Sequence, residues 1–146
     1  MRALVRSTRV LFASLMIAGL LAVGGFGNAS AASGAYITLH VFECPSGGDD
    51  LFAACHSWDN NAIDGASFKV AGSVRDTDWG WVQWKPGAGW KTISALDFVS
   101  PSYVFCSNQV TGAVLYDGRT TSNAVGITTT AGQEVICDWY LLAWWT

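Results

Sequence analysis

Hydrophobic and polar residues alternate along much of the chain after residue 35, with the period of two that is typical of β-strands. In the segment YITLHVF, at 36–42, one face carries Ile37, Leu39 and Val41. His40 lies on the opposite face, where we expect a solvated imidazole. Seven later runs are short and rich in Val, Ile, Thr and aromatic residues. They are ASFKVAG, GWVQW, WKTISAL, SYVFCS, GAVLYD, AVGITTT and QEVICDWYLL.

Turn-forming sequences such as PGAG, SPS and DGRTT separate these runs. No convincing amphipathic helix follows residue 35. Many short strands at near-regular spacing are typical of a sandwich or a barrel, so we predict an all-β domain.

The first 31 residues have the pattern of a secretory signal peptide. An uncharged apolar stretch at 10–26 follows three basic residues, Arg2, Arg6 and Arg9. Ala29 and Ala31 fit the small-residue cleavage rule, which places cleavage after Ala31, with Ala32 as the alternative. A transmembrane anchor is the weaker interpretation, because the stretch is short and rich in Ala and Gly. We therefore expect a secreted protein with one domain at 32–146.

Cleavage makes the protein more acidic. The whole chain has 8 Lys+Arg and 11 Asp+Glu residues. The signal peptide contains three of the basic residues and none of the acidic ones, so the mature net charge is −6. Nucleic acids and anionic membrane surfaces bind basic faces. We therefore expect no nucleic-acid partner, and no membrane partner after cleavage.

Four cysteines remain in the mature part, and an even number in a small exported chain predicts two disulfides. They are Cys44, Cys55, Cys106 and Cys137. A zinc site is the competing interpretation, but the chain has no C-x-x-C pair and only His40 and His56 could assist. We expect no metal and no cofactor.

Three short motifs follow one another in the chain: GASFKV at 65–70, TDWGWVQW at 77–84 and PGAGW at 86–90. Together they resemble the B-type repeat domains of bacterial surface adhesins, which are prealbumin-like sandwiches. Gly89 departs from the family pattern, because it adds one residue before Trp90. The matching residues are Gly65, Ala66, Phe68, Thr77, Asp78, Gly80, Val82, Trp84, Pro86, Gly87 and Trp90, with Ile93 close to a family valine.

The resemblance implies an antiparallel sandwich of about seven to eight strands, with Trp84 and Trp90 as core anchors. Many B-type domains carry an isopeptide bond between a Lys on the first strand and an Asn on the last. This chain has no Lys on its first strand, Ala95 near the position of the promoting Glu, and Asp138 but no Asn on its last strand. We therefore expect no such cross-link.

Disulfides could replace the missing cross-link. The preferred pairing is Cys44–Cys55, which closes a polar loop, and Cys106–Cys137, which ties two late strands. The other two connectivities remain open, because a sequence cannot choose among three.

Four tryptophans are candidates for a ligand or partner surface: Trp79, Trp81, Trp144 and Trp145. Trp79 lies in the TDWG turn, Trp81 points away from the core face that Val82 defines, and the other two follow the last strand. Exposed indoles can stack on sugar rings or anchor a protein interface. The alternative is that these indoles pack against a loop and the edge of the domain.

The remaining polar motifs carry weaker signals. Asp59, Asn61 and Asp64 suggest calcium together with Asp49 and Asp50, but the spacing of a calcium loop fails and a solvated acidic loop fits better. No nucleophile, base and orienting group can be recognised, so we expect no enzyme.

The sequence thus predicts a secreted, non-catalytic extracellular module of the adhesin type, with either a structural or an interaction role. It is released or associated with the cell surface. The alternative is a carbohydrate-binding protein that uses its surface tryptophans. The expected partner is a cell-wall or extracellular glycan, or a protein.

Overall fold

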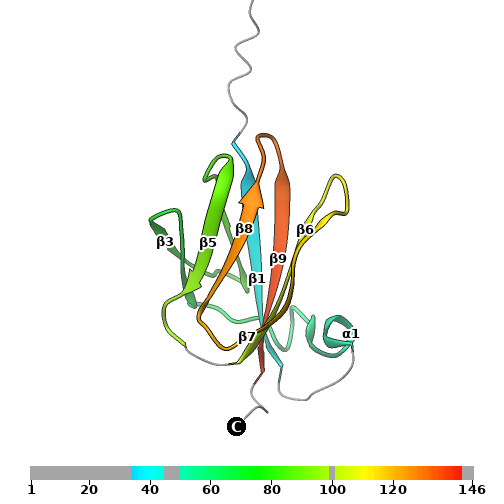
Figure 1. Cartoon of the computed structure of the whole chain (residues 1–146). Coiled ribbons are helices and arrows are strands. Elements are labelled where there is room, and N and C mark those ends of the chain that lie inside the picture. The colour runs from blue at the N-terminus through cyan, green and yellow to red at the C-terminus, as the bar shows by residue number, and fades with distance from the viewer. Residues whose placement is uncertain (1–33, 45–49, 99–100, 143–146) are drawn as a thin grey trace, which may run out of the picture.

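The structure, a computed structural model, describes residues 34–44, 50–98 and 101–142, which fold as a two-layer β-sandwich (Figure 1). The strands are β1 (Tyr36–Cys44), β2 (Ser67–Val70), β3 (Ser73–Asp76), β4 (Trp81–Trp84), β5 (Gly89–Ala95), β6 (Ser102–Asn108), β7 (Val114–Thr120), β8 (Ala124–Thr129) and β9 (Glu134–Leu142). One short helix, α1 (Leu51–Cys55), interrupts them. The predicted all-β sandwich is confirmed, with about nine strands in place of seven to eight.

All eight strand-like runs coincide with strands. The ninth strand, β3, is exposed along its whole length, so its sequence SVRD shows no apolar alternation. Helix α1 was also not predicted. It has only five residues, too few for a helical hydrophobic period, and begins where the side chain of Asp50 accepts a hydrogen bond from the Ala53 amide.

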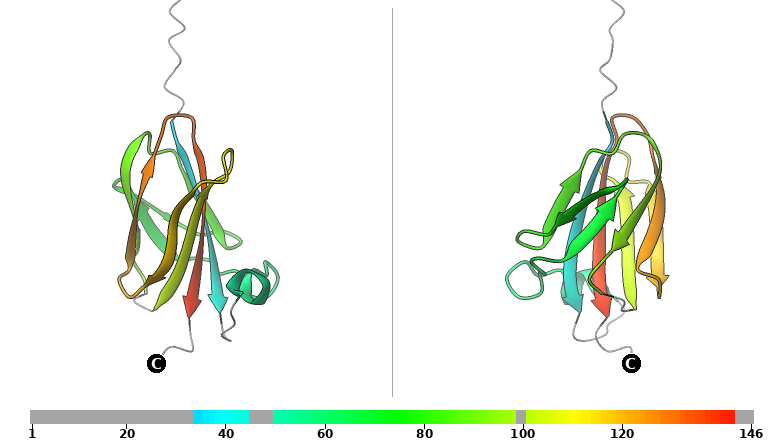
Figure 2. Two further views of the ribbon diagram at one scale, coloured as in Figure 1. Left: turned by 45° about the vertical axis from the view of Figure 1, so that its right-hand side comes forward. Right: turned by 90° about the vertical axis from the view of Figure 1, so that its left-hand side faces the viewer.

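The two layers face each other, as Figure 2 shows. The five-stranded sheet has the order β4-β1-β9-β6-β7, and the four-stranded sheet has the order β3-β2-β5-β8. The strand pairs are antiparallel, as expected, except that β1 and β9 pair in parallel. This pairing sets the first and last strands side by side at the centre of the larger sheet.

The main core lies between the sheets. Inward-facing residues alternate along the strands, with Trp139 of β9 against Phe68 of β2 at a ring-centroid distance of 5.3 Å. Cys106 and Cys137 face each other across β6 and β9 inside this core and form a disulfide. The preferred pairing of the cysteines is therefore confirmed here.

A second, smaller cluster lies on the outer face of the five-stranded sheet, where α1 covers Phe42 and Tyr140. The disulfide Cys44–Cys55 joins the end of β1 to the end of α1, as the preferred pairing has it. Because of this cover, the outer face of β1 is largely buried. The expectation of a solvated His40 is wrong, since its ring lies 4.9 Å from that of Trp58.

The prediction that Trp90 anchors the core is also wrong. Its side chain is 67% exposed and packs over Gly126 on the outer face of the four-stranded sheet. Ile93, three residues later on the same strand, is buried. The additional residue Gly89 explains the difference, because a shift of one residue along a strand moves a side chain to the opposite face.

Several sequence predictions fall outside the described residues. These are the signal peptide at 1–31, Asp49, Trp144 and Trp145. Within the residues that the structure does describe, no helix is both long and apolar enough to cross a membrane. The two disulfides are typical of an oxidising, extracellular environment.

Candidate functional site

A row of outward-facing side chains crosses the five-stranded sheet. Register pairs His40 of β1 with Trp81 of β4 on one side and with Asp138 of β9 on the other. Asp138 in turn pairs with Phe105 of β6, which pairs with Asp117 of β7. Polar and aromatic residues thus lie side by side across the middle of this face, although they are far apart in the sequence.

The segment 50–62 folds across this row and divides the face into two cavities. Beyond His40, β1 leaves β4 and bonds instead to this segment, through Glu43 N–H to the Asn61 carbonyl. The Cys44–Cys55 disulfide fixes the middle of the segment. The segment is therefore tied to β1 at two points, Cys55 and Asn61.

One cavity, which we call the tryptophan cleft, is lined by His40, Trp58, Asp59, Trp79 and Trp81 and has a volume of about 370 Å³. Its three indoles remain accessible, with exposed fractions of 44% for Trp58, 76% for Trp79 and 47% for Trp81. Rigid aromatic planes around a small hollow, with a few polar groups, are typical of small-ligand sites.

A tight turn holds Trp79 at the mouth of the cleft. Asp78 and Trp81 exchange two backbone hydrogen bonds around a two-residue loop, whose residues Trp79 and Gly80 have φ values of 53° and 76°. This is the geometry of a type I′ turn, which favours Asn or Gly at the first central position. A tryptophan there is strained by about 1 kcal/mol or more. Strain of this kind concentrates at functional sites.

The turn is also clamped from below. The Gly80 N–H donates to the carboxylate of Asp64 at 2.7 Å, and the hydroxyl of Thr77 donates to the Ile63 carbonyl at 2.6 Å. Thr77 also accepts a hydrogen bond from the Ala66 amide. Trp79 therefore projects from a fixed base.

We expect Gly80→Ala to lower the free energy of unfolding by about 2–4 kcal/mol, because the left-handed φ and a collision add together. A Cβ at Gly80 would lie 2.5 Å from the Cβ of Ala62. Gly72→Ala is the control, since Gly72 has a φ of 86° but nothing within 4 Å of a new Cβ. Urea unfolding measures both. Equal losses for the two variants would contradict the close approach.

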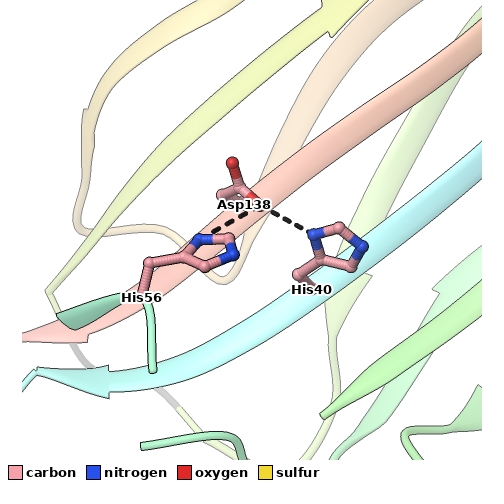
Figure 3. Close-up of side chains that lie close together, drawn as sticks. All are labelled: His40, His56 and Asp138. Carbon is pink, nitrogen blue, oxygen red and sulfur yellow. Dashed lines mark hydrogen bonds and ion pairs between the residues drawn. The ribbon is translucent and has the colours of Figure 1, made fainter. Parts of the chain in front are cut away.

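Beneath the cleft, His40 and His56 flank the carboxylate of Asp138 (Figure 3). The Nδ1 atoms of His40 and His56 lie 2.9 Å and 3.9 Å from Asp138 Oδ1. Burial lowers the pKa of His56, against the opposite effect of Asp138. His56 Nδ1 also lies 3.2 Å from the Tyr140 hydroxyl, whose pKa is strongly raised, mainly by burial. The phenol therefore stays protonated and is a poor nucleophile.

The second cavity, the β6–β9 groove, has a volume of about 780 Å³ and lies on the other side of segment 50–62. Its lining includes Phe52 and Tyr140, with Arg119 and Asp138 among its charged residues. At its edge Tyr103 donates to the Asp117 carboxylate, and this bond raises the pKa of Tyr103. The groove is larger than the tryptophan cleft, but its aromatic residues share the lining with the charged residues Asp50, Arg119 and Asp138.

The structure brings some of the predicted site residues together. Trp79 and Trp81 share the tryptophan cleft. Sequence reasoning missed Trp58, which comes from the irregular segment HSWDN, where no periodicity distinguishes exposed from buried positions. Three of the acidic residues considered for calcium have other roles: Asp50 caps α1, Asp59 lines the cleft and Asp64 accepts a hydrogen bond from the turn.

Comparison of this chain with protein-family models, with curated proteins and with solved structures finds no match in any of the three.

Proposed function

We propose that this protein is a secreted, non-catalytic binding module that recognises a neutral glycan through the tryptophan cleft. The observation that carries the proposal is the convergence of Trp58, Trp79 and Trp81, all partly exposed, on one hollow. Each comes from a different place in the fold: segment 50–62, the turn after β3, and β4.

Chemistry favours a sugar as the ligand. Indole faces pack against the apolar C–H faces of pyranose rings and lose little conformational entropy, because they are held in advance. The Asp59 carboxylate can accept hydrogen bonds from hydroxyl groups, and His40 adds a second polar atom. The acidic mature chain disfavours anionic polymers, so we infer a neutral polysaccharide.

Secretion and the absence of catalysis belong to the same proposal. The two disulfides and the signal-like N-terminal sequence support export. Against catalysis, the hydroxyl beside His56 belongs to Tyr140, whose raised pKa keeps it protonated. A binding module that anchors itself to extracellular glycan needs no further chemistry.

The test is binding to insoluble cellulose, chitin and starch, with pectin as an anionic comparison. We expect retention on at least one neutral polymer and none on pectin. Trp58→Ala, Trp79→Ala and Trp81→Ala should each weaken that binding at least about tenfold, since central aromatic anchors dominate such interfaces. Trp90→Ala is the matched control, because the exposure of Trp90 falls within the range of the three cleft indoles but Trp90 lies on the other sheet.

A further variant separates binding from folding. Trp79→Asn creates the Asn-Gly sequence that type I′ turns prefer, so we expect it to be as stable as the wild type or more stable by about 0.5–1 kcal/mol. It should nevertheless bind the polymer as weakly as Trp79→Ala does. Full binding by this variant would remove Trp79 from the site.

The alternative is a purely structural module of the adhesin type. Its support is the sequence resemblance at 65–90 and the burial of Phe68 and Trp84, which that resemblance expects. The outward position of Trp90 departs from it. This alternative predicts no retention on any of the four polymers, with all three cleft variants indistinguishable from the wild type.

A further inference from the structure

Two imidazoles and one carboxylate meet beneath the tryptophan cleft, and the proposed glycan binding uses only one of them, His40, as a polar group of the cleft lining. We propose that His40, His56 and Asp138 form a binding site for a divalent transition-metal ion of the zinc type. The inference does not rest on the glycan proposal, although His40 belongs to both sites.

The spacing of the donor atoms suits such an ion. One nitrogen or oxygen atom from each residue lies within 4.8 Å of the other two. Ligands at about 2.0–2.2 Å from a tetrahedral Zn²⁺ lie roughly 3.3–3.6 Å from one another. The two separations from Asp138 Oδ1, 2.9 Å and 3.9 Å, bracket this range. Side-chain shifts of less than about 1 Å each would bring all three atoms onto one ion.

The backbone holds the three residues in place before any ion binds. His40 and Asp138 are direct register partners on the parallel strands β1 and β9, so their side chains leave the same face. His56 follows Cys55, which the disulfide ties to Cys44 at the end of β1. Sites built on strands and cross-links are more precise than sites on unsupported loops.

The donor set selects the class of metal. Imidazole nitrogens favour Zn²⁺ and Cu²⁺, whereas Ca²⁺ and Mg²⁺ take oxygen ligands almost exclusively. In the absence of metal, the proton on His40 Nδ1 makes the hydrogen bond to Asp138, so a metal ion would replace that proton. Three protein ligands leave a fourth position for water or for a donor atom of a ligand.

The surroundings shield the site without closing it. Trp58 packs edge-on against both imidazoles, at ring-centroid distances of 4.9 Å from His40 and 5.5 Å from His56. His40 also lines the tryptophan cleft, and Asp138 lines the β6–β9 groove. An ion held here would therefore lie between the two cavities, where a small aqueous ion has two routes of approach.

The test is calorimetric titration of the oxidised protein with ZnCl₂. We expect one Zn²⁺ per chain, with a Kd in the micromolar range or tighter. His40→Ala, His56→Ala and Asp138→Asn should each weaken the affinity at least about tenfold. Glu43→Gln removes a carboxylate from the exposed end of β1 and should change the affinity less than about threefold. Near-UV circular dichroism checks that each variant is folded.

A second readout identifies the coordination directly. Co²⁺ in place of Zn²⁺ should give the visible d–d absorption of a four-coordinate ion with nitrogen and oxygen ligands, and Zn²⁺ should displace it. The proposal is overturned if the wild type binds no Zn²⁺ saturably. It is equally overturned if the His40→Ala/His56→Ala double variant, shown to be folded, binds Zn²⁺ as the wild type does. The cluster would then be a hydrogen-bonded packing element only.

Discussion

Trp139→Ala is expected to lower the free energy of unfolding by about 3–5 kcal/mol, the range for deleting a large buried aromatic side chain. Trp139 is fully buried on β9 and contacts Phe68 of the opposite sheet, so its removal leaves a cavity between the two layers. Urea unfolding followed by far-UV circular dichroism measures the loss. A loss below about 1 kcal/mol would mean that the sheets close over the gap, and that this contact is not central to the core.

Trp139→Phe provides the matched control. The indole Nε1 of Trp139 finds no hydrogen-bond acceptor among the residues that the structure describes, so phenylalanine removes apolar volume without breaking a hydrogen bond. We expect a cost below about 1.5 kcal/mol. Trp84→Phe should cost more than this, because the buried Trp84 donates its Nε1–H to the Ser73 carbonyl at 3.2 Å.

Removing the Cys106–Cys137 disulfide, by replacing both residues with alanine, is expected to lower the free energy of unfolding by at least about 3.5–4 kcal/mol. The bond spans a sequence separation of 31, and loop-closure entropy in the unfolded chain gives this magnitude. Both residues, on the adjacent strands β6 and β9, are completely buried in the core between the sheets, so the loss of core volume adds to the entropic effect.

The other disulfide should behave differently. Cys44–Cys55 spans only 11 residues, for which the same relation gives about 2.5–3 kcal/mol. Its loss should loosen segment 50–62 and leave the main core intact, because Cys44 and Cys55 belong to the smaller cluster outside the sandwich. Denaturation midpoints of the two double variants compare these effects. A larger loss for Cys44–Cys55 would contradict the division into two clusters.

Much of the fold could be predicted from local patterns, because a half-buried strand shows its inner face in alternate residues. This is why the run at 36–42 identified β1. The same reasoning missed β3, whose residues are all exposed and therefore do not alternate. It also misplaced Trp90, where one additional glycine changed the face on which the side chain lies. The parallel pairing of β1 with β9 depends on tertiary contacts that no local pattern contains.

The candidate site could be predicted only in part, for the same reason. The TDWG turn and the alternation of inward and outward side chains along β4 were sufficient to place Trp79 and Trp81 at the surface. Trp58 lies in an irregular segment, and only the path of that segment across the sheet brings it into the cleft. His40 and Asp138 are 98 residues apart and meet through strand register alone.

The central claim is that the tryptophan cleft binds a neutral glycan, and indole N–H signals in ¹H–¹⁵N NMR spectra test it most directly. The protein is titrated with soluble cellohexaose, N-acetylchitohexaose and maltohexaose, and the signals are assigned from single Trp→Phe variants. We predict that one oligosaccharide shifts the indole signals of Trp58, Trp79 and Trp81, while those of Trp84, Trp90 and Trp139 stay in place. Unchanged cleft signals with all three sugars, or shifts confined to Trp90, would contradict the account.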